Sequence, residues 1–460
     1  MPRPSPPLSF VDAVEGSVSL RMAGEVFLDR LGGETSVDSR VVAGPPTRLE
    51  SEWRRLAAHR IGGAAPIVLS YLANYLGRAV FLAPEVRSPR LRALFVGWEL
   101  EQLTTSLHAE LNCADVIVAF SDYVAGVYRR HFPGTPVVAA PICPPLPDGI
   151  PVDRARWRLP EDATVFVTVF DPVSGFDRKN PHDAYRAFAA AFPGREDVRL
   201  VVKAHGRVDR SDATATDGER ARAASFRAAC AADPRVLLVD DYLTYTDVLS
   251  LIASCDAYVS LARAEGIGLP VLEAMSLGVP SICSAYAAHL DFTTADSALH
   301  VPVTLVDIPS DASGHYDPAR YAVPPRWAQP DLEAAAAAMR TLADDPAARA
   351  RWGARASAQA RAYALACAQR PWPGELLTAL ASREVAANHP ARETALRRFA
   401  AGEVAPWADH EYHVRRARRS LAWRTRLGRF KRMLIGRSRG RKATGPTSPD
   451  PAQPTEGTGS

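Results

Sequence analysis

The sequence predicts an α/β protein built from two doubly wound domains. Short apolar runs of strand length alternate with segments of helical periodicity, which is typical of parallel sheets covered by helices on both faces. This alternation occurs twice, and a proline-rich segment separates the two series. The chain has 460 residues, of which 47% are hydrophobic, so it is long for one core and ample for two.

Composition and cysteine usage are those of a soluble protein. Charged residues make up 23% of the chain, and its six cysteines are scattered without a C-x-x-C pair. We interpret them as reduced core thiols in a reducing compartment and not as metal ligands. The apolar run at residues 8–11 is too short for a signal peptide, and no run approaches the ~20 apolar residues of a membrane-spanning helix. We therefore expect a cytoplasmic protein.

The first domain is expected to cover residues 1–145. Gly32 and Gly33 end its first helix, and residues 34–65 show no clear pattern. The expected strands are 8–14, 66–72, 93–96, 116–120 and 137–140, and the expected helices are 20–31, 102–113 and 122–131.

A linker at 146–163 and a second domain at 164–370 follow. The expected strands are 164–170, 198–203, 236–239, 257–261 and 281–284, and the expected helices are 181–192, 220–232, 246–255, 270–277, 332–342 and 347–368. Residues 371–436 are predicted to form carboxyl-terminal helices, and residues 437–460 a disordered tail. Because ligands of open α/β sheets bind at the carboxyl ends of the strands, we expect a cleft between the two sheets.

The segment 263–280 has the strongest pattern of chemistry-bearing residues. Gly266 and Gly268 allow close approach of the backbone to a ligand, and Pro270 opens a helix whose free amides form an anion site. Glu265 and Glu273, eight residues apart, suit hydroxyl groups beside that anion. A phosphate flanked by a sugar and a ribose is one such ligand. The alternative is that Glu265 caps the helix and Glu273 lies on a solvated face.

A second group of charges follows the strand at 164–170. Asn180 is expected as the N-cap of the next helix, with Asp183 at the capping-box position. Arg178 and Lys179 stand beside the amino terminus of this helix, where its dipole disfavours cations unless an anion is shared between them. Lys203, at the end of the next strand, adds a third cation. The alternative is that these three cations are ordinary charges in loops and bind no anion.

These two segments resemble motifs of the family 4 (group 1) retaining glycosyltransferases, which have the two-domain GT-B fold. The spacing of Glu265 and Glu273 matches the family's E-x7-E motif, and residues 178–181 match the R-K-N-P turn of a bacterial branch. In the first domain, residues 96–100 and 118–124 resemble the family's W-E-L and S-x-F-V elements. The first strand departs from the family because it lacks a Gly-Gly loop, and Ala262 stands where a histidine is common.

The resemblance implies a role for each matched residue. Glu265, Arg178 and Lys179 would act in catalysis, and Glu273 would hold the ribose hydroxyls. The implied donor-binding residues are Ser174, Arg178, Lys179, Lys203, Asp241, Tyr242, Leu243, Glu265, Gly266, Ile267, Gly268, Leu269 and Glu273. The acceptor-side candidates are Gly16, Glu99, Glu101 and His108, although a lone histidine such as His108 is more often a packing residue. The family needs no cofactor and no obligate metal.

The function implied is transfer of a hexose from a nucleotide diphosphate sugar to a hydroxyl acceptor, with retention of configuration. The donor is expected to be a UDP- or GDP-linked hexose. The acceptor is expected to be lipid-linked or a saccharide, in bacterial polysaccharide or glycolipid synthesis. The alternative is a catalytically weak nucleotide-sugar-binding partner of another glycosyltransferase, which the altered first domain leaves open.

A basic amphipathic helix is predicted at residues 421–435. Trp423, Leu427, Phe430 and Leu434 fall on one helical face, and Arg and Lys residues fill much of the rest. This pattern favours an anionic membrane surface, which would make the protein peripheral on the inner face of the membrane. A helix packed on the first domain is the alternative. Nucleic acid is not expected as a partner, because no nucleic-acid-binding module accompanies the helix.

Overall fold

The structure, a computed structural model of the 460-residue chain, describes residues 8–13, 18–41, 67–72, 91–145, 149–208, 215–312, 316–382 and 394. The chain divides into the units Met1–His410 and Glu411–Ser460, and every described residue belongs to the first. The predicted helix at 421–435, the predicted tail and Gly16 lie outside the described residues.

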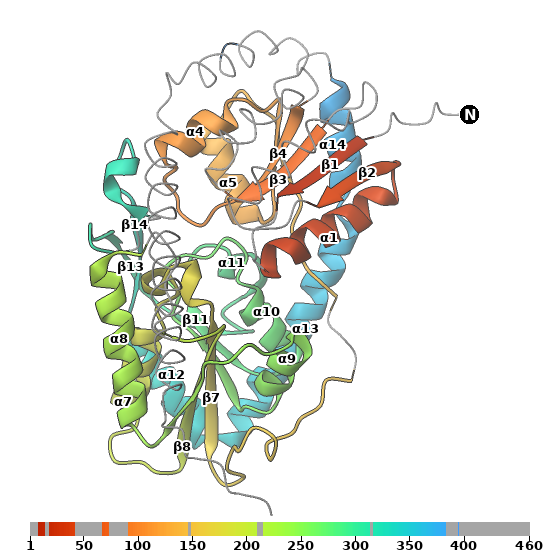
Figure 1. Cartoon of the computed structure of the whole chain (residues 1–460). Coiled ribbons are helices and arrows are strands. Elements are labelled where there is room, and N and C mark those ends of the chain that lie inside the picture. The colour runs from red at the N-terminus through yellow and green to blue at the C-terminus, as the bar shows by residue number, and fades with distance from the viewer. Residues whose placement is uncertain are drawn as a thin grey trace, which may run out of the picture. The chain divides into compact units, whose positions relative to one another are not determined.

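The amino-terminal sheet is parallel, with its strands in the order β2-β1-β3-β4-β5-β6 (Figure 1). These strands are β1 (Leu8–Ala13), β2 (Val37–Val41), β3 (Ile67–Leu72), β4 (Leu91–Gly97), β5 (Val116–Ala119) and β6 (Val137–Ala139). Its helices are α1 (Val18–Gly32), α4 (Thr105–Leu111) and α5 (Asp122–His131). Side chains of α1 pack with β1, β4 and β5 in one core cluster, and those of α4 and α5 pack with β4 and β5 in another.

The second sheet is also parallel, with its strands in the order β12-β11-β10-β7-β8-β9. These strands are β7 (Thr164–Phe170), β8 (Val198–Ala204), β9 (Val236–Val239), β10 (Ala257–Ser260), β11 (Ser281–Ser284) and β12 (Leu299–Val301). One face packs against α7 (Pro181–Ala191), α8 (Asp217–Ala232) and α12 (Leu332–Asp344). The other packs against α9 (Tyr245–Ala253), α10 (Leu269–Ser276) and α13 (Pro346–Gln369). Both strand orders are those of doubly wound α/β sheets.

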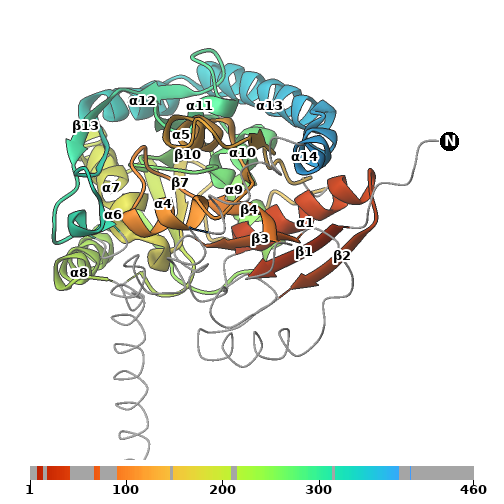
Figure 2. The ribbon, with the colours of Figure 1, turned by 90° about the horizontal axis from the view of Figure 1, so that it is seen from above.

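The chain returns from the second sheet to the first through α13 and α14 (Trp372–Ala381), as Figure 2 shows. Trp372 and Leu376 of α14 are buried in the core cluster that contains α1 and β1. Arg30 of α1 donates hydrogen bonds to the carbonyl oxygens of Cys367 and Arg370, both at 2.7 Å. Helix α14 therefore belongs to the core of the first sheet.

A hairpin extends the second half of the chain toward the first sheet. It consists of β13 (Val303–Asp307) and β14 (Arg326–Pro330), which pair antiparallel. Between these strands, Tyr321 forms an isolated bridge with Thr104, and the amide of Arg326 donates to the side chain of Gln102 at 3.2 Å. Ile308, Ala312, Tyr316 and Tyr321 join the core cluster of α4 and α5.

The predicted fold class is confirmed, and most predicted elements agree with the structure to within a few residues. The prediction missed β2, β12, the β13–β14 hairpin and α11 (His289–Phe292). These elements are short, and β13 and β14 bury only part of their side chains, so neither apolar runs nor a helical period mark them.

Candidate active site

The turn after β7 contains a short helix that the sequence did not predict, α6 (Phe176–Lys179). Asn180 joins α6 to α7 in the left-handed conformation, with φ of +53°. Asn180 is the N-cap of α7, as predicted, but its side chain makes no capping hydrogen bond to that helix, so the predicted capping box is wrong. Because the chain turns at this residue, the side-chain amide reaches Asp183 at 3.0 Å and the carbonyl oxygen of Leu261, after β10, at 2.9 Å. Asn180 thus ties the turn to the central strands.

Arg178 and Lys179 lie in the last turn of α6, where a helix dipole favours cations. The Arg178 guanidinium is only 4% exposed. It donates to the carbonyl oxygen of Ala264 at 2.8 Å, and through Nε and Nη2 to that of Ser174 at 3.2 and 2.8 Å. Arg178 therefore connects two loops at the carboxyl edge of the sheet.

The Glu265 carboxylate is the anion that these two cations share. Lys179 Nζ lies 2.6 Å from Oε1, and Arg178 Nη1 lies 3.4 Å from Oε2. Burial would raise the pKa of Glu265, but Lys179 and Arg178 outweigh it and lower the pKa to about 2. Glu265 is therefore ionised at neutral pH, and the N-cap of α10 is Gly268 rather than Glu265.

The loop between Glu265 and α10 is shaped by two glycines. Gly268, with φ of +83°, precedes α10, and no side chain caps the helix there. The amides of the first turn are therefore without a side-chain cap, as an anion site requires. A Cβ on Gly266 would stand 2.3 Å from the carbonyl oxygen of Trp98, so this loop lies directly against the turn after β4. Ile267 and Leu269 flank Gly268 in the same loop.

Glu273 is buried in α10, at 6% exposure, which contradicts the alternative of a solvated face. The Tyr245 hydroxyl, from α9, donates to its Oε1 at 2.9 Å. Burial raises the pKa of Glu273 to about 7, against the opposing effect of that hydroxyl. The two glutamates of the E-x7-E pattern therefore differ in ionisation.

Lys203 is 1% exposed at the end of β8. Its ammonium donates to the carbonyl oxygens of Ala204 and, at 2.9 Å, Asp241. Burial lowers the pKa of Lys203 to about 8. Of the implied donor-binding residues after β9, Asp241 is therefore held through its carbonyl oxygen by Lys203. Tyr242 is 64% exposed and packs edge-on against His205, and Leu243 packs on the core beneath α9.

The first-domain candidates differ from one another in their surroundings. Glu99 is half-buried, and its charge helps to raise the pKa of the Arg178 guanidinium. The backbone carbonyl of Glu101 contacts His131 Nε2 at 3.0 Å. His108 stacks on Phe132 at a centroid distance of 4.7 Å, and its Nδ1 lies 3.1 Å from the Asn112 amide. Burial lowers the pKa of His108. The contacts of His108 fit a packing role.

Two further residues lie at the site without having been predicted. Tyr316, 4% exposed, lies close enough to Arg178 to help raise its pKa. His289 is 1% exposed, with Nδ1 3.2 Å from the carbonyl oxygen of Ser284, and its Nε2 has no hydrogen-bond partner among the described residues. A Cβ on Gly268 would stand 2.7 Å from the His289 ring. Neither residue belongs to a recognisable motif.

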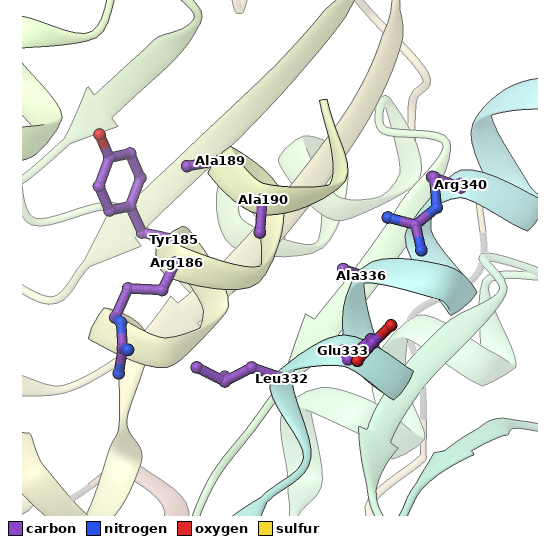
Figure 3. A pocket seen from close by; sticks show the side chains of 8 residues that line it. All are labelled: Tyr185, Arg186, Ala189, Ala190, Leu332, Glu333, Ala336 and Arg340. Atoms are coloured by element: carbon purple, nitrogen blue, oxygen red, sulfur yellow. The ribbon is translucent and has the colours of Figure 1, made fainter. Parts of the chain in front are cut away.

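A shallow pocket of about 550 Å³ lies between α7 and α12, away from these residues. Figure 3 shows its lining, which is Tyr185, Arg186, Ala189, Ala190, Leu332, Glu333, Ala336 and Arg340. None of these was predicted to bind the donor.

Within the described ranges, no group of three or more His, Cys, Asp and Glu residues is arranged to hold a metal ion. No helix in the same part of the chain is long and apolar enough to cross a membrane.

The two parallel sheets and the return of α14 to the first sheet define the GT-B architecture. Residues 153–304 match the family model "Glycosyl transferases group 1". That segment spans β7 to β12 and contains Arg178, Lys179, Glu265 and Glu273. No curated protein matches the sequence significantly.

Several solved structures share the fold over most of their length. Sucrose-phosphate synthase from Thermosynechococcus elongatus is 17% identical, over 80% of this chain and 98% of its own, with a TM-score of 0.55. A UDP-forming α,α-trehalose-phosphate synthase from Burkholderia vietnamiensis is 11% identical, over 81% and 99%, with a TM-score of 0.54. Anabaena HepE, solved in complex with UDP and glucose, is 12% identical, over 79% and 97%, with a TM-score of 0.54. These structural similarities show the fold of this chain.

Proposed function

We propose that this protein is a retaining, metal-independent hexosyltransferase that uses a nucleoside diphosphate sugar. The observation that carries the proposal is the buried cluster of Glu265, Lys179 and Arg178 beside the uncapped start of α10. Uncapped helix amides and two adjacent cations are what a departing diphosphate requires, because its negative charge grows as the glycosidic bond breaks.

The two cations differ in how they can act on a bound diphosphate. Arg178 already holds two backbone carbonyls, so it contributes mainly a fixed positive charge. Lys179 is more exposed and makes one contact with Glu265, so its ammonium is free to rotate toward a ligand. When a diphosphate binds, Lys179 and the α10 amides contact it, and Glu265 is left beside the sugar whose bond breaks.

The second carboxylate supports a ribose-bearing donor. Glu273 lies about one and a half turns along α10 from the loop, paired with one tyrosine hydroxyl. Its carboxylate has capacity to accept further hydrogen bonds from the two ribose hydroxyls. The match to the group 1 family model and the fold shared with UDP-dependent synthases favour UDP or GDP as the nucleotide. The acceptor we propose is a lipid-linked or saccharide hydroxyl in polysaccharide or glycolipid synthesis.

The proposal is tested by incubating the purified protein with UDP- and GDP-linked hexoses and assaying release of the nucleoside diphosphate. We expect release with one donor, undiminished by EDTA, and a product of unchanged anomeric configuration by proton NMR. Inversion of configuration, or loss of activity with EDTA, would overturn the retaining, metal-independent mechanism. Tight diphosphate binding without release by wild-type protein, across sugars and simple acceptors, would instead support the catalytically weak partner.

A further inference from the structure

Asp291 belongs to the second sheet's half of the chain but accepts a hydrogen bond from the first half. It lies in α11, which follows β11, and its Oδ2 accepts from the amide of Tyr123 at 3.0 Å. Burial raises the pKa of Asp291 to about 6, against the opposing effect of the backbone amides of Tyr123 and Asp122. Both amides belong to the first turn of α5, whose own N-cap, Ser121, takes only the amide of Val124. A carboxylate at this position stabilises a helix start by capping and by its charge.

The segment that carries Asp291 also contacts the loop of Glu265. The amide of Ala288 donates to the carbonyl oxygen of Glu265 at 3.2 Å. The next residue, His289, packs its ring against Gly268 at the start of α10. Ala288 and His289 therefore contact the E-x7-E loop, and Asp291, two residues further on, contacts α5.

A second path returns from α5 to the same loop. The Tyr123 hydroxyl donates to the carbonyl oxygen of Glu99 at 3.2 Å. The neighbouring carbonyl of Trp98 lies against Gly266 so closely that no side chain fits at that glycine. The turn at Trp98 and Glu99 is thus fixed on one side by the donor loop and on the other by Tyr123.

We propose that Asp291 is a positioning residue that holds the Trp98–Glu99 turn of the acceptor-side domain against the donor loop Glu265–Gly268. This inference rests on the proposed function for its kinetic consequence, but its structural part does not. Asp291 does not reach the donor-binding groups themselves. It acts by capping α5, and α5 presents Tyr123, whose hydroxyl holds the turn.

The charges around Asp291 come from each element packed on it. Asp122 lies on α5, Arg370 follows α13, and the titratable hydroxyl of Tyr363 lies on α13. Arg370 pairs with both carboxylate oxygens of Asp122, with one contact at 2.7 Å. Arg370 is therefore engaged by Asp122, and the Asp291 carboxylate is held by the amide of Tyr123 in α5.

Hydrogen exchange of the α5 amides tests the structural part directly. In Asp291→Ala, we expect exchange of a peptide covering residues 121–128 to rise about tenfold, because a cap is lost and the first turn opens more often. Asp291→Asn keeps an acceptor oxygen and should restore most of the protection. The matched control is Asp331→Ala, which removes the N-cap of α12 and should raise exchange only there.

Kinetics tests the functional part with the same variants. Asp291→Ala should lower kcat for transfer by about tenfold and leave the dissociation constant of the nucleoside diphosphate within about twofold, because a misplaced turn affects transfer more than binding. Unchanged exchange at α5 in Asp291→Ala, or an equal rise at α5 in Asp331→Ala, would overturn the proposal. So would a parallel loss of kcat and diphosphate affinity. Failure of every nucleoside diphosphate to bind wild-type protein would refute the proposed function but leave the exchange result standing.

Discussion

Charged side chains that follow the strands of the second sheet differ in burial from those that follow β4 in the first sheet. At the second sheet, charged side chains are almost fully buried and are paired with one another, with backbone carbonyls or with a tyrosine hydroxyl; they are Arg178, Lys203, Glu265 and Glu273. At the first sheet, Glu99 and Glu101 are only half-buried, and the groups that hold this turn contact its backbone. The charged groups at the second sheet are therefore preorganised for a charged ligand. At the first sheet, hydrogen bonds fix the backbone of Glu99 and Glu101, and their carboxylates are held less tightly.

This difference indicates which substitutions should alter stability and ligand binding and which should be tolerated. Buried charges cost free energy unless they are compensated, so an ion cluster such as Lys179–Glu265 constrains both stability and ligand choice. Half-buried carboxylates impose little such constraint. We therefore expect substitutions at the second sheet to change several properties together, and those at the first sheet to change few.

The largest effect is expected for Glu265→Gln. Removing this charge leaves Arg178 and Lys179 uncompensated, and the developing charge at the sugar loses a preorganised contact. We expect kcat to fall by about 100-fold, with the donor KM changed less. Because the pKa of Glu265 is lowered, its stabilising contribution is present above the unfolded pKa of 4.5 and is lost as pH falls toward 2. The melting temperature at pH 7 should therefore also fall, and full retention of kcat would show that the sugar lies elsewhere.

The second prediction separates the diphosphate from the rest of the donor. Lys179→Met should weaken binding of a nucleoside diphosphate by about ten- to a hundredfold, since one charge-assisted contact is lost. The affinity for the corresponding nucleoside should stay the same. Calorimetry measures both, and Arg186→Met is the matched control because Arg186 is an exposed cation on the adjacent helix. Equal losses for nucleoside and diphosphate would remove Lys179 from the phosphate site.

The third prediction contrasts Glu273 with Glu265. The folded-state pKa of Glu273, about 7, lies above its usual value of 4.5, so its contribution to stability is greatest below pH 4.5 and is lost as pH rises to 7. Glu273→Gln should therefore raise the free energy of unfolding at pH 8, by on the order of 3 kcal/mol, and hardly change it at pH 4. The same variant should raise the donor KM and reduce the penalty for a deoxyribose donor. A lower melting temperature at pH 8 would contradict the raised pKa.

The smallest effect is expected at the first sheet. His108→Ala removes a ring stacked on Phe132, so it should destabilise the fold by about 1 kcal/mol. Transfer kinetics should change by less than about twofold, as for a surface or packing position. A tenfold loss of kcat with unchanged stability would instead make His108 an acceptor-side group.

The fold was largely predictable because each central strand is a continuous apolar run, as in residues 164–170, and each helix carries its own start signals. Pro181 and Pro270 stand in the first turns of α7 and α10 as expected. The sequence also singled out the charged residues Arg178, Lys179, Glu265 and Glu273, whose roles stay predictions. Their ionisation was not predicted, because the pairing of Lys179 with Glu265 joins residues 86 positions apart.

The remaining features depend on tertiary contacts that leave no local pattern. Asn180 occupies the predicted N-cap position of α7, but its left-handed conformation and its hydrogen bond to the carbonyl oxygen of Leu261, 81 residues away, were not predicted. Tyr316 lies at the site but belongs to the segment between β13 and β14. Asp291 accepts a hydrogen bond from Tyr123 of α5, which is 168 residues earlier in the chain. Such residues become visible only when the chain is folded.

The central claim is that the buried cluster at the second sheet is a nucleoside diphosphate site, and calorimetric titration tests it most directly. UDP, GDP, ADP and dTDP would each be titrated into wild-type protein and into Lys179→Met, with the matching nucleosides alongside. We predict that one diphosphate binds wild-type protein at least about tenfold more tightly than its nucleoside, and that Lys179→Met removes most of this difference. Failure of all four to bind, or a preference for the diphosphate that survives in Lys179→Met, would contradict the claim.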